Sequence, residues 1–252
     1  TLIMETKRLS KEEFAQKMKE KRSVLFNKAD NQLSITVSDK DKYLEFLRVL
    51  ARHNYTVTNT LLIQSQNPNA TILKDVARWR EDGFYIKKNE KGIGIFEPSK
   101  PFMRRDGTQG VNYNVKYIFD ITQTSADTTP SISYPSSTEL EFALKHKEKN
   151  VVDRNPNMNQ LDYLTSTLFQ IVKDEAGQLD EFIVASCVYA LASKYGLQVM
   201  ENFAYSANSY FAHLNPKVIK GKLYSIKELF DIISKRIEHG LYVYAKENTQ
   251  YD

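Results

Sequence analysis

The sequence predicts an α+β N-terminal domain, in which helices accompany a small antiparallel sheet, followed by an all-α C-terminal domain. Three observations support this fold class. Before residue 125, apolar residues follow both helical and alternating patterns, and beyond residue 138 only helical patterns occur. The segment between them is rich in Ser, Thr and Pro. We therefore expect domains at residues 1–124 and 139–252, joined by a linker at residues 125–138.

Three helices and one short strand are expected in residues 10–65. Ser10 and Glu13 have the spacing of a capping box and predict the start of a polar helix over residues 10–22. Apolar residues at helical spacing predict a second helix over 43–50 and a third over 58–65. The alternating, β-branched segment 33–37 predicts a strand between the first two.

Strand patterns continue after Gly83. Segments 84–86 and 93–96 flank a polar, glycine-containing turn, and this arrangement predicts a β-hairpin. A second polar loop at 104–110 leads to another expected strand over 115–121.

The second half shows only helical periodicity. One helix is predicted over 161–172 and a more apolar one over 179–195, each ended by a glycine. A capping box at Ser225 predicts the start of a last long helix, which we expect Gly240 to end.

Charge is distributed unevenly over the 252 residues. Counting Lys and Arg against Asp and Glu, residues 1–125 carry a net charge of +7 and residues 126–252 carry −3. A basic half indicates a polyanionic partner such as nucleic acid, although scattered lysines also serve solubility. No stretch approaches the roughly 18 apolar residues that cross a bilayer, so we expect a cytoplasmic protein without a membrane partner.

Motifs for catalysis are missing from the sequence. It has no phosphate-binding loop and no nucleophile elbow, and Gly92-Ile93-Gly94 lies within the predicted hairpin, unlike a dinucleotide fingerprint. The single cysteine, Cys187, lies on an apolar helix and is expected to be a buried structural thiol. The sequence therefore predicts a protein that is not an enzyme and has no catalytic residues and no cofactor.

A metal site is not expected either. The histidines are separated by more than twenty residues each, whereas a zinc peptidase helix carries two of them one turn apart. They are His53, His146, His213 and His239. A cluster of His213, His239 and Glu238 formed by the fold remains an alternative.

Basic and aromatic residues alternate along residues 78–91 and recur up to residue 117. Proteins hold single-stranded nucleic acid with cations along the phosphates and aromatic faces under the bases. Trp79 has an alternative role as a core anchor. The pattern gives these candidates for nucleic-acid binding: Arg78, Trp79, Arg80, Tyr85, Lys87, Lys88, Lys91, Arg104, Lys116 and Tyr117. Arg105 and the ring of Tyr113 could extend the same surface.

Three motifs occur in order along residues 8–124. The first runs from Tyr55 to Ala70, the second from Trp79 to Pro98, and the third from Phe119 to Thr124. Together they resemble the N-terminal single-stranded-DNA-binding domain of ArdC-type antirestriction proteins and the related LtrC-like proteins of conjugative elements. Asn89 departs from the glycine often found in the family's turn, and Asn tolerates the same backbone.

This resemblance implies an accessory protein of a plasmid, integrative element or phage. It would bind single-stranded DNA without sequence preference and act in DNA transfer, replication or protection. The first and third motifs add Tyr55, Asn59, Gln66 and Gln123 to the candidate DNA contacts. Transfer or replication proteins of the same element are further expected partners.

The second half resembles the helices that end the family's zinc-peptidase-like domain. It lacks the His-Glu-x-x-His helix, and Ala185 stands where the family has a glutamate ligand. The resemblance therefore implies a peptidase-derived helical domain without a metal. An alternative function is an anti-restriction or anti-defence inhibitor that binds a host protein complex through this acidic half, although the acidity is also typical of a solvated bundle.

Overall fold

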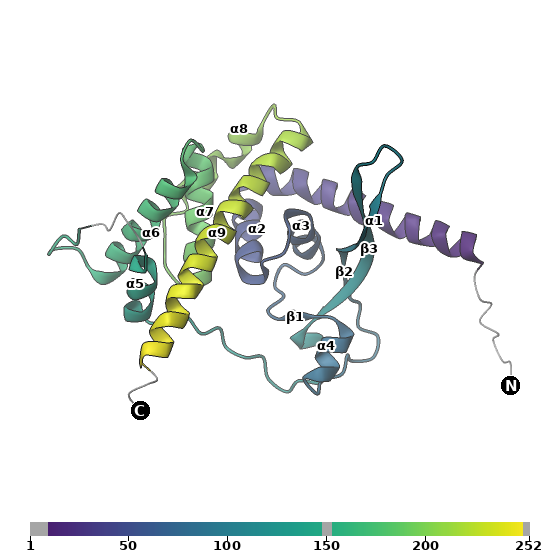
Figure 1. The fold of residues 1–252 in the computed structure, drawn as a ribbon, viewed down its shortest axis with the longest axis horizontal. Coiled ribbons are helices and arrows are strands. Elements are labelled where there is room, and N and C mark those ends of the chain that lie inside the picture. The colour runs from purple at the N-terminus through teal and green to yellow at the C-terminus, as the bar shows by residue number, and fades with distance from the viewer. Residues whose placement is uncertain (1–9, 148–152, 249–252) are drawn as a thin grey trace.

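The computed structural model describes residues 10–147 and 153–248, and it has the predicted fold class (Figure 1). Helices and a small antiparallel sheet form the first half, and helices form the second. The first half contains α1 (Lys11–Ser38), α2 (Lys40–His53), α3 (Val57–Gln66), β1 (Leu73–Lys74), α4 (Val76–Glu81), β2 (Ile93–Met103), β3 (Gln109–Asp120) and the 3-10 turn η1 (Ile121–Gln123). The second contains α5 (Ser137–Lys145), α6 (Gln160–Ala176), α7 (Glu181–Tyr195), η2 (Asn202–Ser206), α8 (Ala207–Phe211) and α9 (Pro216–Asn248).

Helix α1 begins as predicted and is longer than predicted. Ser10 Oγ accepts from the Glu13 N–H at 3.1 Å and Glu13 Oε2 accepts from the Ser10 N–H at 2.7 Å, which confirms the capping box. The strand predicted over residues 33–37 is wrong, because α1 continues to Ser38. Leu25, Ala29, Leu33 and Val37 recur every four residues and are buried, so packing of this stripe overrides the β-branched pattern.

The hairpin pairs residues 93–96 with a different partner from the predicted one. β2 pairs with β3 in antiparallel register around the Asp106-Gly107 turn, where Gly107 has a φ of +81°. Residues 84–86 make only an isolated bridge, between Ile86 and Thr124. They do not pair with 93–96, because β3 occupies one edge of that segment and side chains of α3 cover the other.

β2 lies at the edge of the sheet, whose order is β1-β3-β2 in the described residues. Two amide side chains of α3 cover this edge. Asn59 Nδ2 donates to Phe96 O and Asn59 Oδ1 accepts from Phe96 N–H, both at 2.8 Å. Gln66 pairs with the N–H and carbonyl of Gly94 in the same way, both at 3.0 Å. Each satisfies polar backbone groups that an uncovered edge strand would leave unpaired.

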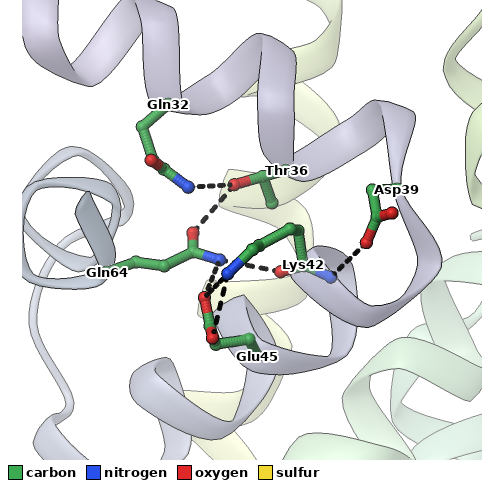
Figure 2. Close-up of polar contacts among 6 residues, drawn as sticks. All are labelled: Gln32, Thr36, Asp39, Lys42, Glu45 and Gln64. Carbon is green, nitrogen blue, oxygen red and sulfur yellow. Dashed lines mark hydrogen bonds and ion pairs between the residues drawn. The ribbon is translucent and has the colours of Figure 1, made fainter. Parts of the chain in front are cut away.

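A buried polar network fixes the crossing of the first three helices (Figure 2). Thr36 of α1 donates to Gln64 Oε1 at 2.8 Å, and Gln64 Nε2 donates to the Lys42 carbonyl of α2 at 2.8 Å and to Glu45 Oε1 at 3.1 Å. Gln32 adds a hydrogen bond to Thr36 at 3.3 Å. Because Gln64 and Thr36 are buried, breaking one bond would leave a partner unsatisfied.

The core joins the two halves. Its largest cluster contains Leu33, Leu47 and Leu61 from the first half together with Leu168 and Phe230 from the second. A buried hydrogen bond of 2.8 Å between the hydroxyls of Tyr43 and Ser186 links α2 to α7. Residues 125–136 contain no helix or strand, as expected of a linker, yet the shared core crosses it. The division into two domains stays a prediction.

The last helix starts earlier and ends later than predicted. α9 begins at Pro216, where Asn215 Oδ1 accepts from the Val218 N–H at 3.0 Å. Ser225 and Gly240 therefore lie within the helix, and Gly240 is buried against Ala143 of α5. None of the helices in residues 10–147 and 153–248 is long and apolar enough to span a membrane.

Candidate nucleic-acid interface

A groove of about 780 Å³ lies where the hairpin meets helices from both halves of the chain. Its lining comes from α1, the start of α3, β1 and α4, the hairpin, and α9. The charged lining residues are Lys74, Asp75, Arg78, Glu97, Lys116 and Lys220, and the aromatic ones are Phe26, Tyr55, Phe96, Tyr113 and Tyr224. Cations thus outnumber carboxylates, and aromatic rings accompany them.

The cations of the groove differ in how far they are neutralised. Lys116 Nζ lies 2.8 Å from a Glu97 oxygen and 2.9 Å from an Asp75 oxygen, and both bonds raise the pKa of Lys116. Lys74 pairs with Asp82. Arg78 is exposed, and its guanidinium makes no ion pair with any described residue, so it is available to a phosphate.

Three aromatic residues at the groove have nearly half of their surface exposed to solvent. They are Phe26 of α1 at 44%, Tyr113 of β3 at 45% and Tyr224 of α9 at 47%. Phe26 stacks on the buried Phe96 with ring centroids 4.2 Å apart, and Tyr113 meets Phe96 edge-on at 6.1 Å. Packing on Phe96 holds the two outer rings in place while leaving a face of each in solvent. Rings presented in this way can stack on nucleobases.

Four of the predicted site residues meet in this groove: Tyr55, Asn59, Arg78 and Lys116. Partial burial raises the pKa of Tyr55, and the charges of Lys116 and Arg78 act in the opposite direction, which places the phenol beside both cations. Sequence reasoning therefore found one side of the groove.

Four predicted contacts, among them Asn59 of the groove, have structural roles. Asn59 and Gln66 bind the edge of β2, as described above. Gln123 Oε1 accepts from the Asp120 N–H at 3.0 Å, and its Nε2 donates to Glu90 Oε2 and Lys91 O. Trp79 is buried, and its Nε1 donates to Phe119 O at 2.9 Å, which confirms the alternative role in the core. These polar groups are hydrogen-bonded within the protein, and contact of the four residues with DNA stays a prediction.

The remaining candidates are exposed but lie outside the groove. Lys87 Nζ donates to Thr122 O at 3.0 Å, and Arg104 bonds to Thr108 and Gln109 at the hairpin tip. Tyr117 lies 5.6 Å from Lys21 Nζ of α1. The others are Arg80, Tyr85, Lys88 and Lys91, around the loop that follows α4.

Sequence reasoning missed Phe26, Lys74, Lys220 and Tyr224 as members of one site. Tyr113 was considered as a stacking face, because it continues the aromatic pattern of the strand that contains Tyr117, and it lines the groove. Phe26 and Tyr224 lie on helices whose length was predicted wrongly, and only the packed structure brings them to the hairpin.

The described residues hold no group of three or more His, Cys, Asp or Glu side chains that could bind a metal ion. The rings of His146 and His239 lie with their centroids 5.4 Å apart. Within residues 10–147 and 153–248, no third His, Cys, Asp or Glu side chain joins them to form a metal-binding group. Burial raises the pKa of the Cys187 thiol, so this side chain is a poor nucleophile.

No protein-family model matches the sequence, and no curated protein is significantly similar to it. Two solved structures of the antirestriction protein ArdC from plasmid R388 are similar in fold. The metal-free form has a TM-score of 0.46 at 12% identity and covers 73% of this chain and 86% of its own. The Mn(II)-bound form has a TM-score of 0.45 at 13% identity, with coverage of 73% and 85%.

Proposed function

We propose that this protein binds single-stranded DNA without sequence preference, and that the groove between the hairpin and helices α1, α4 and α9 is the binding site. The observation that carries the proposal is the combination of an unpaired cation, Arg78, with the exposed rings of Phe26, Tyr113 and Tyr224 in one groove. Backbone phosphates and unstacked bases are the two chemical features that such a lining recognises together.

The side chains that line the groove favour a single strand over a duplex. In a duplex the base faces are stacked on one another and are not open to side chains, whereas a single strand presents them. Three of the four cations that line the groove, Lys74, Lys116 and Lys220, pair with described carboxylates, so the lining does not offer the row of unpaired cations by which duplex DNA is usually held.

The biological setting rests on the sequence motifs. Their resemblance to ArdC-type proteins supports an accessory role in a mobile element, in DNA transfer, replication or protection from restriction. We further propose that the protein is not an enzyme and acts in the cytoplasm through binding alone. The proposal that the protein is not an enzyme is supported by Cys187, because burial raises the pKa of its thiol and makes it a poor nucleophile.

The inhibitor alternative receives less support from the charges of the second half. Glu141 pairs with Lys145, Asp231 with Lys227 and Glu238 with Lys194. These carboxylates are neutralised within the same half, so they do not form the unpaired acidic surface that a DNA mimic would present.

Fluorescence anisotropy with the full chain tests the proposal. A labelled single-stranded oligonucleotide of about 16 nucleotides should bind more tightly than the corresponding duplex. The logarithm of its affinity should fall with the logarithm of salt concentration, with a slope of about −0.7 per neutralised phosphate. Arg78→Ala should lower both affinity and slope, and Arg80→Ala, the matched control on the same helix outside the groove, should change them less. Equal affinity for both DNA forms, or a flat salt response, would overturn the proposal.

A further inference from the structure

We propose that helix α9, which belongs to the second half of the chain, supplies one wall of the DNA-binding groove through Lys220 and Tyr224. This inference rests on the proposed function. It extends the site to a segment that begins about 100 residues after Ile118, the groove residue that precedes Lys220 in the sequence.

The position of both side chains on α9 supports the inference. Lys220 and Tyr224 are four residues apart, so they lie one above the other on the same face of the helix, and both line the groove. The adjacent face of the helix carries Ile219, Leu223 and Ile226, which are buried in the core shared by both halves. The core therefore fixes α9 in rotation and directs these two side chains towards the groove.

Their chemistry matches the rest of the lining. Tyr224 adds a third half-exposed ring to those of Phe26 and Tyr113, and the three rings come from separate elements. Lys220 Nζ lies 2.7 Å from Asp30 Oδ1 of α1. Because the Asp30 side chain is itself 56% exposed, this ion pair is weak enough for a phosphate to compete for the lysine.

The net charge of the second half conceals this contribution. Residues 126–252 carry −3 overall, but the groove receives from them only a cation and an aromatic ring. The second half therefore contributes to DNA binding directly, and the site is incomplete without it.

The test uses the full chain, because residues 1–124 alone would lack their packing partners from the second half in the shared core. Affinity for single-stranded oligothymidylate is measured by anisotropy for Tyr224→Ala and for Tyr224→Phe. Loss of one stacked ring should weaken binding about 5- to 100-fold, and the Phe variant, which keeps the ring, should restore it. Tyr242→Ala, on the same helix at 63% exposure and away from the groove, is the matched control and should bind like the wild type.

Lys220→Ala tests the second residue through the salt dependence. It should reduce the slope of log affinity against log salt by about 0.7, whereas Lys235→Ala, an exposed lysine of α9 outside the groove, should leave the slope unchanged. If Arg78→Ala weakens binding and the α9 variants match their controls, the inference fails while the proposed function stands. If the wild type does not bind the oligonucleotide, the proposed function fails and this inference fails with it.

Discussion

The ammonium group of Lys116 lies 2.8 Å from Glu97 Oε1, across the two strands of the hairpin. Asp75, which caps α4, holds the same ammonium from the other side at 2.9 Å. The groove thus contains a cation that two carboxylates neutralise beside Arg78, which is unpaired within the described chain. The balance between these groups sets how strongly the groove attracts phosphates.

Removing one of the carboxylates should strengthen DNA binding. Glu97→Gln deletes a negative charge from the groove and releases Lys116 from one partner, so affinity for single-stranded DNA at low salt should rise about two- to fivefold. Anisotropy titrations check this, with Glu81→Gln, an exposed carboxylate of α4 outside the groove, as the matched control. Equal gains for both variants would show a general charge effect and contradict the role given to Glu97.

Asn59 should contribute to stability more than to DNA contact. Asn59→Ala leaves the N–H and the carbonyl of Phe96 unpaired in a buried place, and should lower the free energy of unfolding by about 2–4 kcal/mol. Urea denaturation measures the loss. Asn112→Ala, at an exposed position of β3, should stay within about 0.5 kcal/mol of the wild type. A similarly small effect of Asn59→Ala would show that the edge of β2 does not need this side chain.

Two glycines of α9 should respond to alanine with opposite signs. A Cβ at Gly240 would lie 2.7 Å from Ala143 Cα, so Gly240→Ala forces α5 and α9 apart and should destabilise the protein by about 1–3 kcal/mol. A Cβ at Gly221 meets nothing within 4 Å, so Gly221→Ala should stabilise the helix by about 0.5–1 kcal/mol. Thermal unfolding of the pair checks both signs, and a gain from both variants would rule out the close packing at Gly240.

His53 should make stability depend on pH. Burial lowers the pKa of His53 to about 4, while its Nε2 donates to Ala70 O at 3.0 Å. The unfolded chain therefore takes up the proton first, and stability should fall by about 3 kcal/mol as pH drops from about 6.5 to 4. His53→Gln keeps a donor but cannot titrate there. Urea midpoints at pH 7 and pH 4.5 should show a smaller acid loss for the variant, and identical losses would contradict the buried neutral imidazole.

Strong local signals in the sequence predicted much of the fold. The apolar residues of 43–50 form the buried face of α2, the strongly apolar segment 179–195 forms the largely buried helix α7, and Ser10 caps α1 as expected. Predictions failed where packing decided between local alternatives. Residues 33–37 have strand propensity but extend the buried stripe of α1, and residues 93–96 pair with the long strand β3 rather than with the predicted partner 84–86.

The candidate site was predicted less completely than the fold. Arg78 and Lys116 belong to the basic and aromatic pattern of one sequence region and were found in it. Asn59 and Gln66 were assigned to DNA because their amides stand in a shared motif, but the edge of β2 uses these amides. Tyr224 lies on a helix more than 100 residues away, and no local pattern indicates which face of that helix meets the hairpin.

Photochemical cross-linking tests the central claim, that the groove is the DNA-binding site, most directly. Single-stranded DNA carrying 5-iododeoxyuridine is irradiated with the full chain, and mass spectrometry locates the modified residues. Base stacking in the groove predicts adducts on Phe26, Tyr113 or Tyr224, which an excess of unlabelled single-stranded DNA should suppress. Adducts confined to Tyr85 and Tyr117, which are exposed outside the groove, would contradict the account.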